Sequence, residues 1–296
     1  MLAVVGTIPE EGFPLKAGEV SLEKDSIRVG DRLVPVNRGT PALLAAAIKS
    51  GEVLGLSLPF GYLVGDIGLG KGSRRLYGHL AEVLPRFPFS VITFHYLQPD
   101  VDWHNKVLFA AEGMNPRPIL IADAGFMYAA KMSGQSETYE LFTPDVGELA
   151  FLADEEAPHP FYTRGFILHD ENRIPNLITR AYEHKNAARY LLVKGRKDHV
   201  ASREGIHAII DHPVDEALEA MGGTGDSLTG IVSTLIASGM ETLEAAILAG
   251  RINRLAGHLA GLTPASQVME VIAYIPKAME EVLKGRDKRH ELGHQP

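Results

Sequence analysis

The 296-residue chain contains no cysteine. This absence excludes a disulfide framework, a thiolate metal site and a cysteine nucleophile. Positive charge is also in short supply, because 29 lysine and arginine residues stand against 37 aspartate and glutamate residues. With a formal net charge of −8 and no dense basic stripe, the chain is not expected to bind nucleic acid as its main partner.

Long apolar runs and targeting signals are missing as well. No apolar run approaches the roughly 20 residues that a membrane helix needs. The N-terminal residues lack the basic segment of a secretory signal. The 12 histidines show none of the tight spacings that bind zinc. We therefore expect a cytoplasmic protein with no membrane partner and no zinc centre.

Short apolar runs alternate with stretches of helical spacing along most of the chain. The runs with strand character lie at residues 61–64, 90–94, 119–122 and 190–193. This alternation predicts βαβ units, which build a mainly parallel sheet with helices on both faces. From residue 227 to about residue 283, the spacing predicts successive helices that cover the end of the sheet.

The two ends of the chain differ from this pattern. Residues 1–38 show period-two alternation with glycine and aspartate turns, which predict a small N-terminal β-rich cap. Residues 39–283 are predicted to form one α/β domain. Residues 284–296 are charged and poor in apolar side chains, so we expect a disordered tail. No spacing fixes the oligomeric state, and a homo-oligomer is left open.

The most informative motif is Gly-Thr-Gly-Asp at residues 223–226, directly before an apolar helical run. The amides of Gly223, Thr224 and Gly225 lie at the positive end of this predicted helix and suit an anion such as phosphate. A carboxylate beside a phosphate is repelled unless it has a task, so Asp226 is a candidate general base for a hydroxyl. The alternative is a glycine-rich turn in which Asp226 only caps the helix.

The run Gly-Thr-Gly-Asp-Ser-Leu-Thr-Gly at residues 223–230 resembles the anion-hole signature of the ribokinase-like superfamily. Within that superfamily, the chain is most similar to the carbohydrate-kinase-like family of ADP/ATP-dependent NAD(P)H-hydrate dehydratases. The resemblance implies a ribokinase-like three-layer α/β sandwich with a mostly parallel central sheet. It also implies ATP or ADP and Mg²⁺ as cofactors.

Further segments resemble motifs of the same family. Residues 141–149 resemble its Thr-Pro-His-Pro-Gly-Glu motif, and residues 191–195 resemble its strand that ends in Lys-Gly. Residues 121–125 resemble its Asp-Ala-Asp segment, and residues 65–70 resemble its Gly-Pro-Gly-Leu-Gly loop. The similarity is weak before residue 119 and strong from residue 141 onward.

The resemblance implies roles for individual residues. The nucleotide-binding residues are expected to be Lys194, Gly195, Gly225 and Asn253. The substrate-binding residues are expected to be Gly68, Asp123, Asp145 and Asp226. Without the resemblance, Lys194 also suits a solvated strand end, and Asn253 also suits a helix surface.

Glu148 is the candidate ligand for a metal ion. It follows a strand-like run and is therefore expected at the carboxyl edge of a parallel sheet, where open α/β folds bind ligands. There it suits a water-coordinated Mg²⁺ near the phosphates. The alternative is a glutamate that caps the following helix.

The sequence departs from the family pattern at two positions. Asp145 replaces the histidine that is expected to touch hydrated nicotinamide, and Val146 replaces a proline. An imidazole can donate a hydrogen bond, whereas an ionised carboxylate can only accept one. The departure therefore weakens the dehydratase hypothesis more than the kinase hypothesis.

Two other features are assigned no chemistry. Residues 68–73 imitate the end of a P-loop, but Gly72 separates Lys71 from Ser73, so the spacing excludes a P-loop. The polar and aromatic residues His95, Tyr96 and Trp103 follow an apolar run. We interpret them as a packed loop rather than as the wall of a substrate pocket.

Three functions are consistent with these motifs. The first is phosphoryl transfer from ATP or ADP to the hydroxyl of hydrated NAD(P)H, after which elimination restores the nicotinamide ring. The second is a kinase for a sugar or a hydroxymethyl heterocycle, which shares the same first step. The third is a sensor that binds nucleotide without catalysis, against which the presence of Asp226 argues.

Overall fold

The computed structural model describes residues 1–155, 173–215, 217–218, 221–263 and 265–292. Its strands form one 11-stranded sheet in the order β11-β10-β9-β8-β7-β6-β1-β5-β2-β3-β4. The strands are β1 (Leu2–Ile8), β2 (Lys16–Glu23), β3 (Ser26–Val29), β4 (Arg32–Pro35), β5 (Phe60–Gly65), β6 (Val91–His95), β7 (Ile119–Ala122), β8 (Leu141–Phe142), β9 (Tyr190–Val193), β10 (Asp198–Ser202) and β11 (Gly205–Ile210).

The middle of the sheet is parallel. Strand β1 pairs in parallel with β5 and β6, and the parallel pairing continues through β7 and β8 to β9. Antiparallel strands extend both ends, where β2 pairs with β5 and β10 pairs with β9. The predicted mainly parallel sheet is therefore confirmed.

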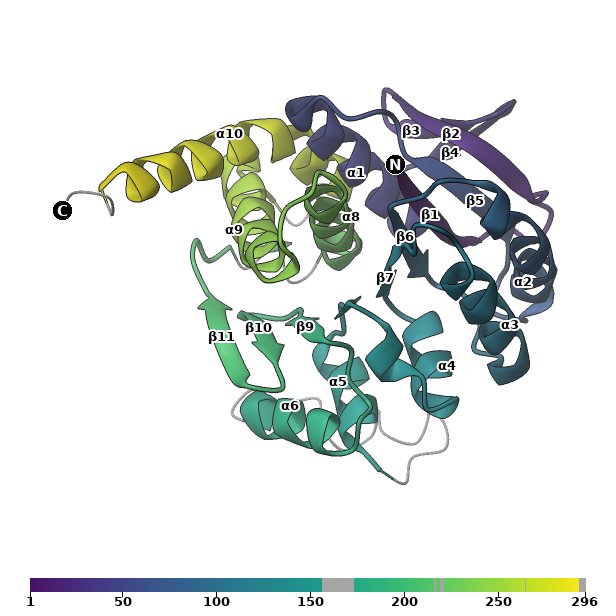
Figure 1. Ribbon diagram of the computed structural model, residues 1–296. Helices are drawn as coiled ribbons and strands as arrows, with labels where there is room; N and C mark the ends of the chain where they lie inside the picture. The colour runs from purple at the N-terminus through teal and green to yellow at the C-terminus, as the bar shows by residue number, and fades with distance from the viewer. Residues whose placement is uncertain (156–172, 216, 219–220, 264, 293–296) are drawn as a thin grey trace.

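Helices cover both faces of this sheet (Figure 1). They are α1 (Thr40–Leu54), α2 (Lys71–Val83), α3 (Val101–Glu112), α4 (Phe126–Met132), α5 (Val146–Ala153), α6 (Ile174–Glu183), α8 (Thr224–Ala237), α9 (Thr242–Ala260) and α10 (Val268–Leu292), with short 3₁₀ turns η1 (Leu84–Arg86) and η2 (Ser136–Thr138). One core packs α1, α8, α9 and α10 against one face, and a second core packs α2 to α6 against the other. The three layers confirm the predicted sandwich.

The period of a strand explains why β1 contributes to both cores. Leu2 and Val4 belong to the first core, whereas Ala3 and Val5 belong to the second. Gly6 faces the first core, where its missing side chain is required: a Cβ at this position would lie 2.4 Å from the Thr40 hydroxyl oxygen. The absence of a side chain therefore lets α1 approach the centre of the sheet.

The N-terminal segment differs from the expectation of a single β-rich cap. Strand β1 lies in the middle of the sheet and is buried along its whole length. Its continuous apolar sequence is typical of a strand that is covered on both faces. Only β2, β3 and β4 form an antiparallel extension at one end of the sheet.

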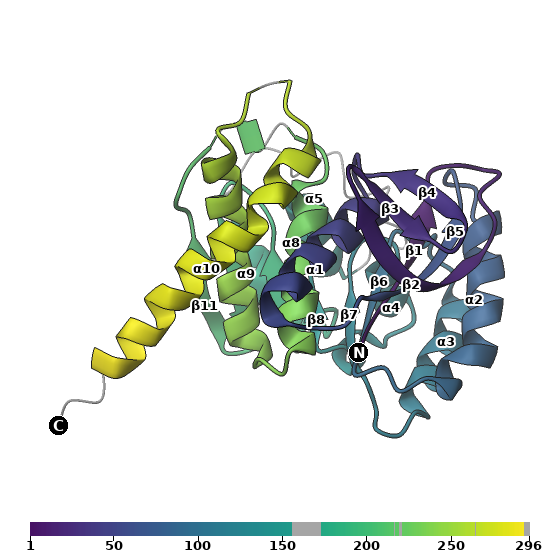
Figure 2. The same cartoon turned by 90° about the horizontal axis from the view of Figure 1, so that it is seen from above.

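The C-terminal tail also differs from its prediction. Helix α10 continues to Leu292, because lysine, arginine, glutamate and leucine in this stretch all favour a helix. The end of the helix points away from the body of the protein (Figures 1 and 2). Residues 293–296 of the predicted disordered tail lie outside the described residues. Within the described ranges, no helix is long and apolar enough to cross a membrane.

Candidate active site

Polar side chains gather where four neighbouring parallel strands end. His95 is the last residue of β6, Asp123 follows β7 directly, and Lys194 follows β9 directly. Asp145, shortly after β8, forms an isolated parallel bridge with Lys194. Because these strands are neighbours, their carboxyl ends bring the four residues to one edge of the sheet. Helix α8 begins at the same edge and adds Asp226.

The start of α8 requires glycine. Gly223 is the N-cap and has a φ of 100°, a value that favours glycine. A Cβ at this position would also lie 3.1 Å from the Val268 side chain and 3.2 Å from the Cα of Arg38. Asp226 is the third residue of the helix rather than its cap, which contradicts the interpretation of this aspartate as an ordinary N-cap.

A cavity of about 400 Å³ opens between the start of α8, the end of β9 and α9. It brings together six residues that the sequence analysis selected, namely Asp145, Lys194, Gly195, Thr224, Gly225 and Asn253. Asp123 and Asp226 are almost completely buried, with exposed fractions of 1% and 7%. The predicted nucleotide-binding residues therefore share one cavity, although their sequence positions are far apart.

The carboxylate of Asp226 is held by two donors. The amide of Gly39 donates to Oδ2 over 2.5 Å, and Nε2 of His95 lies 3.0 Å from Oδ1. On its other side, Nδ1 of His95 lies 3.0 Å from the hydroxyl oxygen of Thr40. The side chain of Asp226 therefore has a fixed orientation at the entrance of α8.

Lys194 and Asp123 form a buried ion pair. Nζ of Lys194 lies 2.9 Å from both carboxylate oxygens of Asp123. Burial alone would raise the pKa of Asp123, but the ammonium of Lys194 and the hydroxyl of Thr229 hold this pKa below its ordinary value. Burial would likewise lower the pKa of Lys194, but the neighbouring carboxylates raise it above its ordinary value. Both groups stay charged, and Lys194 is not a solvated strand end.

Asp145 and Glu148 form a capping box at the start of α5. Oδ1 of Asp145 accepts from the amide of Glu148, and Oε2 of Glu148 accepts from the amide of Asp145, each over 2.7 Å. The structure thus shows the helix-capping arrangement that the sequence analysis kept as an alternative. Burial and the charge of Asp145 raise the pKa of Glu148 to about 8, although Lys194 acts in the opposite direction.

This raised pKa predicts that Glu148→Gln stabilises the protein at high pH. The folded-state pKa of about 8 lies above the ordinary value of 4.5, so the folded protein binds the proton more tightly than the unfolded chain. The stability of the wild type should then fall as the pH rises from about 5 to 8. Glutamine keeps the capping box and carries no charge. We expect the variant to exceed the wild type by on the order of 1–2 kcal/mol at pH 9.

Urea unfolding of both proteins at pH 5 and pH 9 measures this effect. The difference between the two proteins should shrink toward pH 5, where Glu148 of the wild type is protonated. An equal difference at both pH values would show that the carboxylate of Glu148 is not the cause.

The side chains at Glu148 provide some, but not all, of the oxygen ligands that a hard cation needs. Asp145 and Glu148 both offer carboxylate oxygens, which are the ligand type that Mg²⁺ prefers. In the described part of the chain, however, no three histidine, aspartate or glutamate side chains cluster in a way that could hold a metal ion. A Mg²⁺ ion at this place would therefore take most of its ligands from water and phosphate, as Mg²⁺ commonly does.

Asn253 links the two helices that border the cavity. Its Nδ2 donates to the carbonyl of Thr224 over 3.1 Å, and its Oδ1 accepts from the hydroxyl of Ser227 over 2.7 Å. The side chain is buried, so Asn253 is not a helix-surface asparagine. These bonds fix the first turn of α8 against α9.

Arg254 is a residue that the sequence analysis missed. Its Nε donates to Oδ2 of Asp198 over 2.8 Å, and its guanidinium also donates to the carbonyls of Gly195 and Arg196. Arg254 therefore fixes the turn after β9 that carries Gly195. The sequence could have indicated Arg254, because it directly follows Asn253, which was predicted to bind nucleotide.

Gly68 lies apart from the cavity that Lys194 and Gly225 share. Its loop follows β5, which is separated from β6 by β1, and borders a different cavity of about 220 Å³. The carboxylate of Asp66 accepts from the amides of Gly68, Leu69, Gly70 and Ser73. These amides are the donors that a P-loop would offer to phosphate, so the structure gives a physical reason for excluding one.

His95 is the second residue that the sequence analysis missed. It was interpreted as part of a packed loop, whereas it ends β6 and contacts Asp226. The signal was its position, because His95, Asp123 and Lys194 each stand at the end of an apolar run. Tyr96 follows it with a φ of 53°, is 45% exposed, and places its ring against that of His95.

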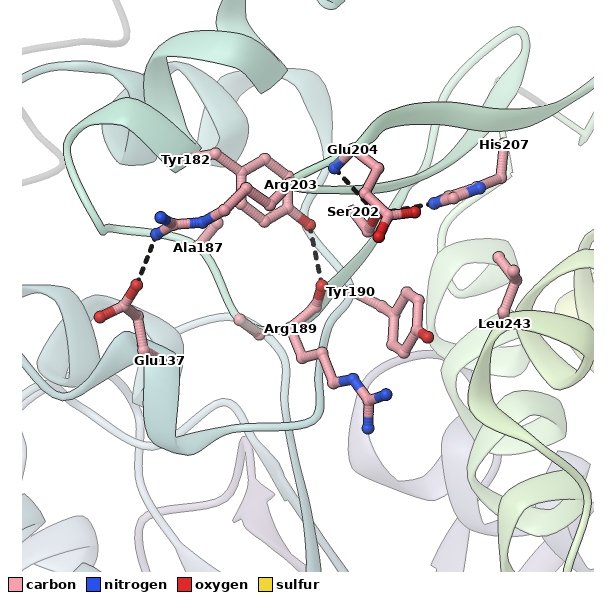
Figure 3. A pocket seen from close by; sticks show the side chains of 11 residues that line it. Glu137, Tyr182, Ala187, Arg189, Tyr190, Ser202, Arg203, Glu204, His207 and Leu243 are labelled. Atoms are coloured by element: carbon pink, nitrogen blue, oxygen red, sulfur yellow. Dashed lines mark hydrogen bonds and ion pairs between the residues drawn. The ribbon is translucent and has the colours of Figure 1, made fainter.

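A third cavity, of about 440 Å³, lies at the opposite edge of the sheet, where β9 begins and β10 ends (Figure 3). Its charged and polar side chains are largely paired: Arg203 contacts Glu137 over 2.7 Å, and Ser202 contacts His207 over 2.7 Å. Among the described residues that line it, none belongs to the predicted site. The candidate active site is therefore the cavity at the carboxyl edge.

Comparison with known sequences gives a consistent set of similarities. Residues 100–277 match the protein family described as NAD(P)H-hydrate dehydratase. An uncharacterized protein of Methanocaldococcus jannaschii is 44% identical over 221 residues, which are 74% of this chain and 90% of that protein. The bifunctional NAD(P)H-hydrate repair enzyme of Pyrobaculum aerophilum is 28% identical over 117 residues, which are 40% of this chain but only 20% of that enzyme.

Comparison with solved structures supports the fold. The ADP/ATP-dependent NAD(P)H-hydrate dehydratase of Bacillus subtilis, co-crystallized with ATP and Mg²⁺, superposes with a TM-score of 0.59. The superposition covers 95% of this chain and 89% of that chain at 13% sequence identity. At this identity the likeness concerns the fold alone.

Proposed function

Because the chain belongs to the NAD(P)H-hydrate dehydratase family, we propose that it transfers the terminal phosphoryl group of ATP or ADP to the hydroxyl of hydrated NAD(P)H. The position of Asp226 carries the proposal. This carboxylate is fixed in the first turn of α8, beside a cavity that Lys194 and Gly225 line. The carboxylate of Asp226, the backbone amides at the start of α8 and the ammonium of Lys194 thus lie close to one another, as phosphoryl transfer requires.

Each residue has a defined task in this reaction. Asp226 accepts the proton of the substrate hydroxyl, and the hydroxyl oxygen then attacks the terminal phosphorus as the nucleotide leaves. The amides of Gly223, Thr224 and Gly225 bind the transferred phosphoryl group at the positive end of α8. Lys194 neutralises phosphate charge, while its ion pair with Asp123 keeps its ammonium in place.

Mg²⁺, when bound, neutralises charge on the phosphate oxygens. Glu148 would hold it through water, and Asp145 offers a second carboxylate nearby. With its pKa raised to about 8, Glu148 is largely protonated at neutral pH when no cation is near, and a cation close to the carboxyl would favour the ionised form that holds it. Among the remaining predicted residues, Gly195 and Asn253 are assigned to the nucleotide, and Asp123 and Asp145 to the substrate. Gly68, whose loop borders a different cavity, is assigned no role in this one.

Phosphorylation converts the hydroxyl of the hydrate into a leaving group. The phosphate departs with the electron pair of the carbon–oxygen bond, and the neighbouring ring carbon loses a proton. The double bond of the nicotinamide ring is thereby restored. The overall result is dehydration of a damaged cofactor at the expense of one phosphoanhydride bond.

One observation favours a second candidate function, which is a kinase for a sugar or a hydroxymethyl heterocycle. Asp145 lines the cavity and accepts from the amide of Glu148, so it offers a substrate a charged acceptor. Such a group suits the hydroxyls of a polyol at least as well as a carboxamide. In that case the phosphoester is the final product.

Incubation of the purified protein with hydrated NADH or NADPH, Mg²⁺ and either ATP or ADP tests the proposal. We expect nucleotide-dependent recovery of the absorbance of the reduced nicotinamide. A parallel panel replaces the hydrate with sugars and hydroxymethyl heterocycles and measures nucleotide consumption. Turnover of the panel alone would support the kinase, and a thermal shift with nucleotide but no turnover would support a sensor.

A further inference from the structure

His95 is a completely buried histidine whose two ring nitrogens both have partners. Nε2 lies 3.0 Å from Oδ1 of Asp226, and Nδ1 lies 3.0 Å from the hydroxyl oxygen of Thr40. The exposed fractions of His95 and Thr40 are both 0%. Neither side chain can therefore contact a substrate directly, and the carboxylate that His95 contacts most closely is that of Asp226.

The chemistry of the partners defines the direction of the hydrogen bonds. An ionised carboxylate only accepts, so Nε2 of His95 must carry a proton and donate to Asp226. The hydroxyl of Thr40 can donate or accept, so it completes the bond to Nδ1. Thr40 thus prevents the ring from rotating away from Asp226. Catalytic histidines are commonly oriented by a hydrogen bond to their second ring nitrogen.

The contact between Thr40 and His95 depends on the pairing of β1 with β6. In the β1–β6 register, Gly6 is the partner of His95. A Cβ at Gly6 would lie 2.4 Å from the hydroxyl oxygen of Thr40, so glycine is needed for the threonine to reach the ring. The amide of Gly39, the neighbour of Thr40, donates to the second oxygen of Asp226. Residues 39–40 therefore support both sides of the carboxylate.

A second carboxylate stands nearby but is already neutralised. Oδ2 of Asp123 lies 3.8 Å from Nε2 of His95, compared with 3.0 Å for Oδ1 of Asp226. Asp123 is paired with Lys194 and also accepts from the hydroxyl of Thr229 over 2.6 Å. The shorter contact assigns the ring proton to Asp226.

We propose that Thr40 and His95 are positioning residues that hold Asp226 in its reactive orientation. The inference rests on the proposed function only in taking Asp226 as the base. The pair keeps the carboxylate plane fixed at the entrance of α8, so that the carboxylate meets the substrate hydroxyl without reorganisation. Thr40 acts indirectly, because it orients the ring of His95, which in turn contacts Asp226.

Two substitutions of His95 separate the hydrogen bond from the volume of the ring. His95→Phe fills the space without a donor, whereas His95→Gln places an amide donor near the position of Nε2. We expect His95→Phe to reduce kcat by about 10- to 100-fold, with the KM and the Kd for nucleotide within about twofold of the wild type. His95→Gln should restore kcat to within about fivefold.

Thr40→Val and Thr40→Ser form a second matched pair. Valine has the shape of threonine but no hydroxyl, and serine keeps the hydroxyl. We expect Thr40→Val to lower kcat by about 2- to 10-fold and Thr40→Ser to remain near the wild type. Thermal unfolding of every variant identifies any that fail to fold. If His95→Phe does not fold, Thr40→Val, which leaves the ring of His95 in place, still tests the inference.

A double-mutant cycle with Asp226→Asn gives the decisive result. If His95 acts through Asp226, His95→Phe should lower kcat no further in the Asp226→Asn background. Equal losses in both backgrounds, or equal kcat values for His95→Phe and the wild type, would overturn the inference. If Asp226→Asn itself retains full turnover, the assignment of Asp226 as the base fails, which is a distinguishable outcome.

Discussion

Asp226→Asn should reduce turnover by about 10²-fold or more, while the affinity for ATP and ADP changes by less than a few fold. Asparagine has the shape of aspartate, and its carbonyl oxygen can still accept from the amide of Gly39. It cannot take a proton from a hydroxyl at neutral pH. The amides at the start of α8 are unaffected, so the binding of phosphate should persist.

Single-turnover kinetics and calorimetric titration with nucleotide measure the two quantities separately. Asp215→Asn is the matched control, because Asp215 lines the cavity beside the start of α8 and its Oδ1 accepts from the amide of Ala217. It removes one negative charge without removing the base, and we expect turnover within about threefold of the wild type. Retained turnover in Asp226→Asn would reject the assigned role.

Lys194→Met should affect stability and nucleotide binding together. Removing one partner of a buried ion pair leaves Asp123 charged without compensation, which costs about 3–5 kcal/mol of the free energy of unfolding. The loss of a charged donor to phosphate should also weaken nucleotide binding by about tenfold or more. The single variant alone cannot separate these two causes.

The double variant Lys194→Met/Asp123→Asn separates them. Neutralising both partners should recover most of the stability, because no unpaired charge is left in the interior. The affinity for nucleotide should stay low, since the cation is still missing. Urea unfolding and titration with ATP and ADP measure the two effects. An affinity equal to that of the wild type in the double variant would exclude Lys194 from nucleotide binding.

The local chemistry of the site was predictable from the sequence, but its long-range contacts were not. Gly223 and Asp226 could be placed at a helix entrance, because glycine and small polar residues precede an apolar helical run. The ion pair between Asp123 and Lys194 joins residues that are 71 positions apart. It depends on the order of the strands in the sheet, which no local pattern encodes.

Local patterns also left two interpretations of Glu148 undecided. The sequence between Thr143 and Glu148 suits both a strand end that faces a ligand and the start of a helix. In the structure Glu148 closes a capping box, and the burial of its carboxylate raises its pKa. That burial arises from surrounding elements, so only the three-dimensional structure shows that a capping residue also has unusual electrostatics.

The fold was predictable except at the two ends of the chain. The alternation of strands and helices gave the three layers, but the hairpin pattern of residues 16–36 concealed the apolar strand before it. At the C-terminal end, the sequence pattern predicted too little regular structure. Charged residues without apolar neighbours suggested disorder, whereas the same residues favour continuation of a helix that has already formed.

The central position of β1 determines when the site can form during synthesis. Val4 is aligned with Gly61 of β5 and with Thr93 of β6, so its neighbours are translated long after it. Until His95 has been translated, Gly6 has no strand on its second side and Thr40 has no ring to contact. Pairing between such distant segments is slow compared with the formation of local helices. The residues that support Asp226, namely Gly39, Thr40 and His95, are all translated before α8, so Asp226 is the last member of this contact to be synthesised.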